Sequence, residues 1–256
     1  MKFFASGMSG TIGRHLPNSI ESFQFRKFTS EIELSIDKSV EFDFIHLAGV
    51  VGESAVSRDL KESYEVNVTR TIRLASNLRG YNLRRFVYVS SSHVYATSND
   101  PLKESADRRP SSNYAIQKME CEDRLVNLFK ANPTQLCILR PFSVLSLNSA
   151  EGSLGALAKR ALEDKRIRIS YVDDIRDFLT PNRICEIILK LNKLSEMPLV
   201  LNICSGVGTS VRDSLIKLVN SYDKTFDKNQ LVSGVSSNPI IVGDSSLLLK
   251  TLNKNE

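Results

Sequence analysis

Near its start the chain reads Lys2-Phe3-Phe4-Ala5-Ser6-Gly7-Met8-Ser9-Gly10-Thr11-Ile12-Gly13. The first five residues of this stretch predict a short apolar strand, and three glycines then follow at G-x-x-G-x-x-G spacing before the helix-compatible Arg14-His15-Leu16. Glycines at this point let the backbone turn sharply and let a pyrophosphate approach the amides at a helix N-terminus. The spacing differs from the common G-x-G-x-x-G dinucleotide fingerprint, so the triplet alone is equally well explained as a turn.

Beyond this loop, strand-like and helix-like stretches alternate along most of the sequence. Such alternation predicts a parallel sheet that helices cover on both faces, which places the chain in the α/β class. Strands are predicted at 2–6, 22–26, 42–47, 85–90, 135–139 and 199–203, with a short one at 167–170. Helices are predicted at 56–78, 114–129, 154–165, 181–194, 210–222 and 245–252. Pro17 ends the first helix soon after the glycines, so that helix is unusually short.

A tyrosine and a lysine, Tyr114 and Lys118, stand four residues apart at the start of a predicted helix, so their side chains share one face. A phenol has a pKa near ~10, and a lysine held beside it stabilises its anion. Moving that pKa to about 7 takes roughly 3 units, or ~4 kcal/mol. Upstream, a strand runs into Ser90, Ser91 and Ser92, where a hydroxyl would hold a substrate oxygen while the proton moves. Alone, Tyr-x-x-x-Lys is an exposed helix pair; beside the glycine turn and the serines it predicts an acid–base site.

Together these residues resemble the short-chain dehydrogenase/reductase superfamily, specifically its extended branch of sugar-nucleotide epimerases, dehydratases and reductases. The likeness runs nearly end to end. The stretches that carry it are Gly7…Gly13, His46-Leu47-Ala48-Gly49, 67–71, 88–95, Tyr114…Lys118, Leu139-Arg140-Pro141-Phe142, Arg176-Asp177-Phe178 and 201–206. The resemblance implies a Rossmann-like doubly wound parallel sheet formed by residues 1–142 plus 179–204, which bind NAD(P). It also implies a small C-terminal substrate-binding lobe formed by residues 143–178 plus 205–256.

The resemblance also assigns roles to single residues. The family's catalytic serine lies four residues before the Val-Tyr tyrosine, which selects Ser91, although a one-residue register error would select Ser90 or Ser92. Tyr114 is then the proton donor or acceptor, and Lys118 holds both the ribose and the phenol. The residues expected to bind the cofactor are Gly7, Gly10, Thr11, Ile12, Gly13, Arg14, Arg26, Leu47, Ala48, Gly49, Asn67, Tyr114, Lys118 and Pro141. Those expected to bind the substrate are Ser92, His93, Ser143 and Arg176.

Several of these assignments leave an alternative open. His93 is either a second acid–base group or a hydrogen-bonded structural histidine. Arg176 resembles the arginine that holds the substrate's phosphates, but an ion pair with Asp173 or Asp177 would also explain it. Asn67 either bridges the backbone and the active site or is a surface polar residue.

The cofactor is predicted to be NADP or NAD, with NADP favoured. An acidic residue at the end of the second strand would bind the ribose 2′-hydroxyl and favour NAD. This strand instead ends at Phe25-Arg26-Lys27, and Arg14 follows the last glycine. Guanidinium groups suit a 2′-phosphate.

The chain departs from the family pattern at two places. The family's 4,6-dehydratases carry Thr-Asp-Glu at the serine site, and this chain has Ser91-Ser92-His93, without a carboxylate. Dehydration is therefore disfavoured. Ser143 stands where the family usually has an asparagine, and the chain is shorter than typical members, so we expect a trimmed substrate lobe.

The composition and charge of the chain indicate which partners and which compartment to expect. The 256 residues are 41% apolar, and no run approaches the ~18 apolar residues that span a bilayer, so no membrane partner is expected. The net charge of +5 is spread in pairs without an aromatic ladder, which disfavours a nucleic-acid partner. Four cysteines lack metal-like spacing, and no secretory leader is recognisable, so a metal-free protein in a reducing cytoplasm is expected. A homodimer is expected by family analogy alone.

These observations lead to one hypothesis and one alternative. The hypothesis is an NAD(P)-dependent oxidoreductase or epimerase that acts on a nucleotide-activated sugar at a keto/alcohol carbon, as a 4-keto reductase or a 4-epimerase of polysaccharide biosynthesis. The alternative is a regulatory or scaffold protein of the same fold that binds NAD(P) with reduced catalysis.

Overall fold

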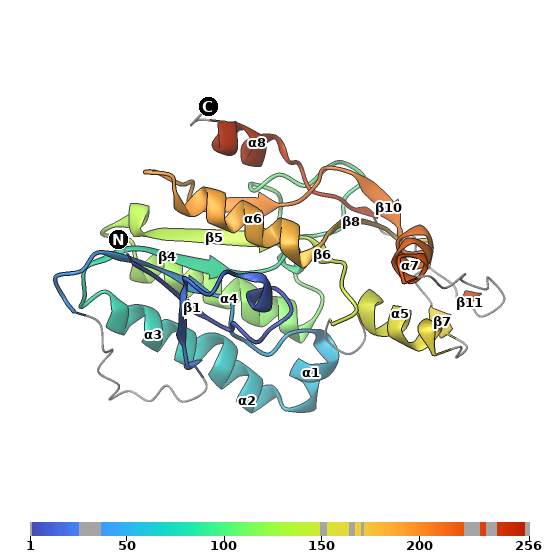
Figure 1. Ribbon diagram of the computed structural model, residues 1–256, viewed down its shortest axis with the longest axis horizontal. Helices are drawn as coiled ribbons and strands as arrows, with labels where there is room; N and C mark the ends of the chain where they lie inside the picture. The colour runs from blue at the N-terminus through green and yellow to red at the C-terminus, as the bar shows by residue number, and fades with distance from the viewer. Residues whose placement is uncertain are drawn as a thin grey trace.

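The computed structural model describes residues 2–25, 37–148, 153–163, 167–169, 172–222, 231–233 and 240–253. Its centre is a sheet of six strands in the order β2-β1-β3-β4-β5-β9, in which every neighbouring pair is parallel (Figure 1). The strands are β1 (Lys2–Ser6), β2 (Glu21–Phe23), β3 (Phe42–His46), β4 (Leu83–Val89), β5 (Leu136–Pro141) and β9 (Val200–Ile203). The predicted α/β class is confirmed.

Helices cover both faces of this sheet (Figure 1). On one face, α3 (Thr71–Leu78) and α4 (Asn113–Leu128) bury Leu74, Leu78 and Leu125 against the strand side chains. On the other face, α6 (Pro181–Asn192) and α8 (Ser246–Leu252) bury their apolar residues, including Leu248. Because both faces are covered, β3 and β5 are buried along their whole length, which explains their nearly continuous apolar sequence.

Strand β1 is the point where the strand order reverses. Its neighbour on one side is β2, and on the other side β3 to β9 follow in chain order. In open α/β sheets, ligands bind beyond the carboxyl ends of the strands at such a switch point. The glycine loop leaves β1 at this position. The buried side chain of His46 joins β3 to β1 and α3 by two hydrogen bonds. Its Nδ1 pairs with Ser6 Oγ at 2.7 Å, and its Nε2 pairs with Thr71 Oγ1 at 2.9 Å.

Two predicted helices differ from the structure. After the glycines only a 3-10 turn forms, Gly13–His15, and Leu16 is already extended ahead of Pro17. The predicted helix at 56–78 is broken into α1 (Glu53–Arg58), α2 (Leu60–Tyr64), a π-helical turn (Glu65–Arg70) and α3. Asp59 makes the break, since its backbone is extended and its side chain caps α2 by accepting from the Glu62 amide at 2.9 Å.

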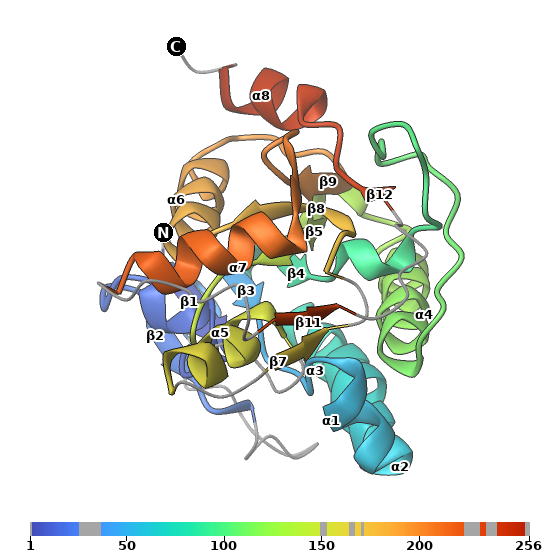
Figure 2. The ribbon, with the colours of Figure 1, turned by 90° about the vertical axis from the view of Figure 1, so that its right-hand side faces the viewer.

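A smaller lobe lies at one end of the sheet (Figure 2). Its core joins α5 (Leu154–Leu162) to α7 (Val211–Asn220) through the buried side chains of Ala158 and Leu215. The lobe strands are β6 (Ser143–Val144), β7 (Ile167–Ile169), β8 (Ile175–Leu179), β10 (Gly208–Ser210), β11 (Leu231–Ser233) and β12 (Ile240–Ile241). The C-terminal α8 packs with α6 on the six-stranded sheet rather than with this lobe. The exact division into two parts stays a prediction.

Within the described ranges, no helix has the length and hydropathy needed to cross a membrane. Nor do His, Cys, Asp and Glu side chains gather there in groups suited to a metal ion. All four cysteines are buried and unpaired.

Candidate active site

The glycine loop is held by close backbone packing. Gly7 has a φ of +77°, and a Cβ at this residue would stand 2.6 Å from the amide nitrogen of Ala48. A Cβ at Gly13 would stand 2.2 Å from the Gly7 carbonyl oxygen. Both positions therefore require glycine for the loop to close on itself and on the end of β3.

Gly10 is different, because it is exposed and less closely packed. A Cβ there would meet the Gly7 carbonyl oxygen at 3.1 Å, and no other described atom within 4 Å. Nearby, the amides of Thr11 and Ile12 donate no hydrogen bond to any described residue. Unpaired amides beside an open glycine fit the pyrophosphate of a dinucleotide, so the loop suits NAD(P). Leu47, Ala48 and Gly49 follow β3 and lie next to this loop.

Two side chains of the loop make contacts that the sequence did not predict. Thr11 Oγ1 donates to the Asn148 carbonyl oxygen at 2.7 Å, which links the loop to the segment after β6. The exposed guanidinium of Arg14 donates to the carbonyl oxygens of Gly10 at 3.1 Å and Ser9 at 3.2 Å. Arg14 thus lies folded along the outside of the loop. Arg26, also expected to bind the cofactor, lies outside the described residues.

Asn67 joins the loop after β3 to the helix that carries Tyr114. Its Oδ1 accepts from the Val50 amide at 2.7 Å, and its Nδ2 donates to the Val50 carbonyl at 3.0 Å and to Gln117 Oε1 at 2.8 Å. Gln117 Nε2 donates in turn to Ser63 Oγ at 3.0 Å. Asn67 is buried in the π-helical turn, so it is not a surface residue. Its predicted bridging position is what the structure shows, and its contact with the cofactor stays a prediction.

The helix α4 begins directly before Tyr114 because two side chains satisfy its first amides. Ser112 caps the helix by accepting from the Ala115 amide at 3.2 Å. The carboxylate of Glu53, from α1, accepts from the Tyr114 amide at 3.0 Å and from Asn113 Nδ2 at 3.1 Å. A carboxylate at a helix N-terminus also complements the helix dipole. Glu53 therefore fixes where the phenol stands.

Ser91 follows β4 and is the serine that meets Tyr114. Its hydroxyl is close enough to the phenol to lower the phenol's pKa by hydrogen bonding. Ser91 Oγ also pairs with His93 Nδ1 at 2.9 Å and accepts from the His93 amide at 3.2 Å. Ser90 Oγ is buried without a hydrogen-bond partner in the described part of the chain, and Ser92 is buried as well. The geometry therefore favours Ser91 over its two neighbours.

Tyr114 and Lys118 are both buried on the same face of α4. Lys118 Nζ donates to the Val89 carbonyl oxygen at 2.9 Å and lies 4.8 Å from the centre of the Tyr88 ring. Burial lowers the pKa of Lys118 to about 8, against smaller opposing effects of Cys121 and Glu122. Ser91, Tyr114 and Lys118 thus come from two adjoining elements, β4 with its following turn and α4.

One expectation about the phenol is wrong. The sequence predicted that Lys118 would bring the pKa of Tyr114 down to about 7. Burial instead raises the pKa of Tyr114 to about 12, and the hydrogen bond with Ser91 opposes it only in part. The phenol is therefore protonated at neutral pH, since desolvation disfavours its anion more strongly than its protein neighbours favour it.

His93 and Arg176 border the same site. The His93 ring meets the Tyr114 ring edge to face, with 6.1 Å between centroids. Solvent reaches this ring although protein atoms surround it, and burial together with the positive charge of Arg176 lowers its pKa. Arg176 itself pairs with Asp174 at 2.7 Å, whereas Asp173 pairs with Arg212, and Asp177 accepts from the amides of Ser205 and Gly206. The predicted substrate residue His93 therefore lies against Tyr114, and the charge of Arg176 acts on His93.

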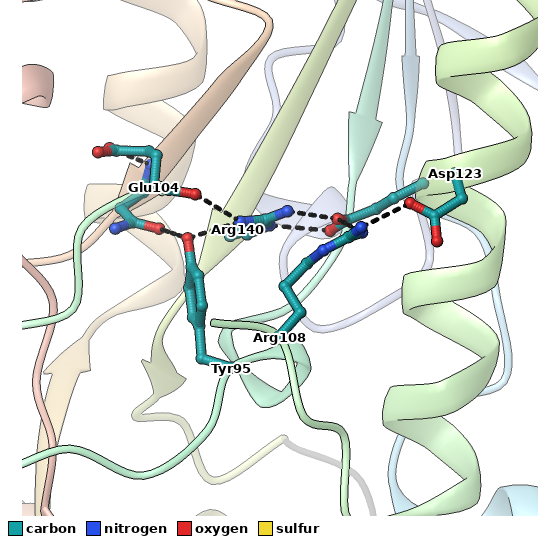
Figure 3. Close-up of polar contacts among 7 residues, drawn as sticks. Tyr95, Glu104, Arg108, Asp123 and Arg140 are labelled. Atoms are coloured by element: carbon teal, nitrogen blue, oxygen red, sulfur yellow. Dashed lines mark hydrogen bonds and ion pairs between the residues drawn. The ribbon is translucent and has the colours of Figure 1, made fainter. Parts of the chain in front are cut away.

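The far half of α4 is fixed by a buried charge network (Figure 3). Arg140, on β5, donates to both carboxylate oxygens of Glu122, at 3.0 and 2.6 Å. It also donates to the hydroxyl of Tyr95 at 2.8 Å and to the Glu104 carbonyl oxygen at 3.2 Å. Arg108 adds contacts to Glu122 at 3.3 Å and Asp123 at 2.8 Å. The network joins α4 to β5 and to the segment that follows the serines.

The sequence reasoning missed Glu53, Gln117 and the Arg140–Glu122 pair. A signal existed only for Arg140, inside the Leu139-Arg140-Pro141-Phe142 stretch. Pro141 ends β5 and is buried, and Ser143 is half-buried in β6, which pairs with β8. The contacts of Pro141 with a cofactor and of Ser143 with a substrate stay predictions.

The structure combines a parallel sheet, a glycine loop at the switch point of that sheet, and the side chains of Ser91, Tyr114 and Lys118. This combination defines a Rossmann-type dinucleotide-binding protein of the short-chain dehydrogenase/reductase class. The model of the NAD dependent epimerase/dehydratase family matches residues 32–204. The chain belongs to this family, and the predicted family resemblance is confirmed.

Known relatives and structures agree with this assignment. The chain is 28% identical to the GDP-6-deoxy-D-talose 4-dehydrogenase of Aggregatibacter actinomycetemcomitans, over 98% of this chain and 91% of that protein. It is 27% identical to the GDP-6-deoxy-D-mannose reductase of Pseudomonas aeruginosa, over 85% and 79%. The structure of RMD from Pseudomonas aeruginosa complexed with NADPH superposes with a TM-score of 0.81 at 19% identity, over 98% and 92%.

These comparisons confirm the prediction of an NAD(P)-dependent enzyme of the extended short-chain dehydrogenase type. They give no support to the alternative of a regulatory or scaffold protein, since the matched relatives are enzymes.

Proposed function

We propose that this protein reduces a 4-keto group on a nucleotide-activated 6-deoxyhexose, or oxidises the corresponding alcohol, with NAD(P) as the hydride carrier. The observation that carries the proposal is the contact of Ser91 with the phenol of Tyr114. Tyr114 shares one face of α4 with Lys118. The open glycine loop supplies the place for the dinucleotide.

The three side chains divide the chemistry. A bound nicotinamide supplies or accepts the hydride. Tyr114 gives its proton to the reacting oxygen, and Ser91 donates a hydrogen bond to the same oxygen. Lys118 is an ammonium at neutral pH, because its pKa is about 8, and it stabilises the tyrosinate that forms.

A 4-keto reductase requires a phenol that donates its proton to the keto oxygen, and the buried Tyr114 is protonated at neutral pH. A 4-epimerase would use the same groups but return the hydride to the same sugar within one turnover. The two relatives that cover most of this chain are a 4-dehydrogenase and a reductase of GDP-6-deoxy sugars, which supports the reductase over the epimerase.

The substrate is expected to carry a nucleoside diphosphate. Arg176 brings a positive charge to bear on His93, and we propose that this charge receives the diphosphate of the substrate. Ser92 and Ser143 would line the sugar from the two sides of the site. The relatives favour a guanosine diphosphate sugar. A place in polysaccharide biosynthesis stays a prediction.

The test is turnover on a panel of GDP- and UDP-linked 4-keto-6-deoxyhexoses with NADPH and with NADH, followed by loss of absorbance at the nicotinamide band. We expect steady reduced-cofactor consumption and a loss of at least about 10²-fold in Tyr114→Phe. Tyr222→Phe is the matched control, because that phenol is exposed on the lobe. Tightly bound NAD with no net consumption would identify an epimerase, and less than tenfold loss in Tyr114→Phe would refute the assigned roles.

The preference for NADP rests on Arg14, whose exposed guanidinium lies along the glycine loop. A 2′-phosphate would replace the two backbone carbonyls as its partner. Arg14→Gln is expected to weaken NADPH binding and leave NADH binding nearly unchanged, as measured by fluorescence titration. Equal affinities of the unmodified protein for both cofactors would refute the preference.

A cytoplasmic homodimer is the form we propose. Leu60 on α2 and Ile116 on α4 lie on neighbouring helices and are 50% and 45% exposed. Burying these residues against a second copy would remove apolar area from water. Light scattering of Ile116→Glu beside the unmodified protein tests this, and an unmodified protein that is monomeric at micromolar concentration would refute it.

A further inference from the structure

His93 connects the active site to solvent through a short chain of hydroxyl and imidazole groups. Its Nδ1 lies 2.9 Å from Ser91 Oγ, and Ser91 contacts the phenol of Tyr114. Tyr114 is 8% exposed, whereas His93 is an exposed residue. The path of contacts from Tyr114 through Ser91 to His93 therefore leads from a buried hydroxyl oxygen to a residue that solvent reaches.

The proposed reduction creates a need for such a connection. Each turnover removes the proton of Tyr114, and the resulting tyrosinate must regain one before the next substrate reacts. Direct exchange with water is hindered because the phenol is buried. A neutral imidazole has one donor and one acceptor nitrogen, so it can pass a proton on from one side to the other.

We propose that His93 relays protons between solvent and Tyr114 through the Ser91 hydroxyl. This inference rests on the proposed function. In the reprotonation step, the Ser91 O–H bond breaks as its proton joins the tyrosinate oxygen, and the His93 Nδ1–H bond breaks as that proton joins Ser91 Oγ. As Nδ1 releases its proton, Nε2 takes one from water, so the ring stays neutral, and proton exchange with water then returns it to the Nδ1–H tautomer. The net change is one proton moved from water to the phenol, with no change in oxidation state.

The surroundings keep the ring suited to this role. The ring contacts the Tyr114 ring from α4 and the Ser91 hydroxyl from its own turn, and the Arg176 guanidinium from β8 acts on it through its positive charge. Burial and the charge of Arg176 both lower its pKa, so the neutral ring that a relay requires predominates at pH 7. If His93 had only a structural role, its hydrogen bond to Ser91 would be enough. The relay also requires a ring nitrogen that gains and loses a proton.

That difference defines the activity test. His93→Asn places an amide near the position of Nδ1 and keeps a hydrogen bond to Ser91, but it has no titrating nitrogen. We expect turnover at pH 7 to fall about 10²-fold with the substrate KM within threefold, and added imidazole to restore it in part. Full turnover in His93→Asn would overturn the relay. A loss that imidazole does not restore, with a large rise in KM, would make His93 a substrate contact and would also overturn it.

A second measurement does not depend on activity. The chain has three histidines, so the ¹⁵N resonances of the His93 ring are readily assigned by comparison with His93→Asn. Tyr114→Phe, which lies one hydrogen bond beyond Ser91, is expected to shift the tautomer ratio or pKa of His93, as is Ser91→Ala. Unchanged His93 resonances in Tyr114→Phe would overturn the relay. If the unmodified protein turns over no nucleotide sugar, the proposed function fails, and this NMR coupling alone decides whether the hydrogen-bonded path exists.

Discussion

Removing the guanidinium of Arg140 tests how strongly the buried charge network holds the active-site helix. The side chains of Arg140 and Glu122 are 4% and 2% exposed, and they share two hydrogen bonds of 3.0 and 2.6 Å. In Arg140→Met, a methionine of similar length fills much of the space, so the main loss is electrostatic. Glu122 is then left as a buried carboxylate with Arg108 as its remaining cation, at 3.3 Å.

The expected cost follows from these contacts. Breaking a buried ion pair by removing one partner costs about 3–5 kcal/mol. The variant also removes the charged donor of two further acceptors, the Tyr95 hydroxyl and the Glu104 carbonyl oxygen. Leaving each of these acceptors without a donor costs up to ~1–3 kcal/mol. Arg108 compensates part of the loss by turning toward Glu122. We therefore expect Arg140→Met to lower the free energy of unfolding by about 4 kcal/mol, out of a typical total of 5–15 kcal/mol.

A double-mutant cycle measured by urea unfolding separates this effect from packing. Glu122→Met alone should destabilise by a similar amount, because Arg140 then becomes the unpaired buried charge. The double variant leaves neither charge unpaired, so its loss should be smaller than the sum of the two single losses by about 3 kcal/mol. Single losses that add to within about 0.5 kcal/mol would refute the claim that the pair is coupled.

Two further predictions concern the glycine loop and Lys118. Gly13→Ala should destabilise the protein, because its Cβ would stand 2.2 Å from the Gly7 carbonyl oxygen, whereas Gly10→Ala should fold normally and bind NADPH more weakly. Thermal melting compares the stability of the two variants, and fluorescence titration compares their affinity for NADPH. Equal melting temperatures of Gly13→Ala and Gly10→Ala would contradict the packing argument. Burial lowers the pKa of Lys118 from 10.5 to about 8, so between these pH values the unfolded chain holds a proton that the folded protein has released. The stability of the unmodified protein relative to Lys118→Met should therefore be flat below pH 8 and rise by about 3 kcal/mol toward pH 10.5, as followed by denaturant unfolding. A relative stability that falls over this range would reverse the sign and exclude the burial argument.

The sequence predicted the six-stranded sheet because its signal is local. Apolar runs such as 42–47 are dense enough to mark buried parallel strands, and the structure places β3 at Phe42–His46. The helix that carries Tyr114 and Lys118 was predicted at 114–129 and is found at Asn113–Leu128. The shared face of these two residues follows from helical periodicity alone. Ser91 was harder to choose, because three serines in a row leave the register open until the backbone is known.

What the sequence did not predict depends on residues far apart in the chain. Glu53 contacts the Tyr114 amide across 61 positions, and no periodicity connects a carboxylate on one helix with the first turn of another. The pKa of Tyr114 was predicted in the wrong direction because burial, which opposes the effect of Lys118, depends on packing that the sequence does not display. The helix at 56–78 was predicted as continuous because 3.6-residue periodicity survives the break at Asp59.

The missed residues share one physical role: they hold α4 in place along its whole length. Glu53 fixes the first turn, Gln117 fixes the middle through Asn67, and Glu122 fixes the next turn through Arg140. Tyr114 and Lys118 project from the same helix between these attachments. A hydrogen bond to a substrate oxygen tolerates little displacement of the phenol, since proton transfer requires heavy atoms about 2.6–3.2 Å apart. Polar contacts at three points on one helix, two of them made by the buried Gln117 and Glu122, therefore serve the catalytic face, and loss of any one is expected to displace Tyr114 before it unfolds the protein.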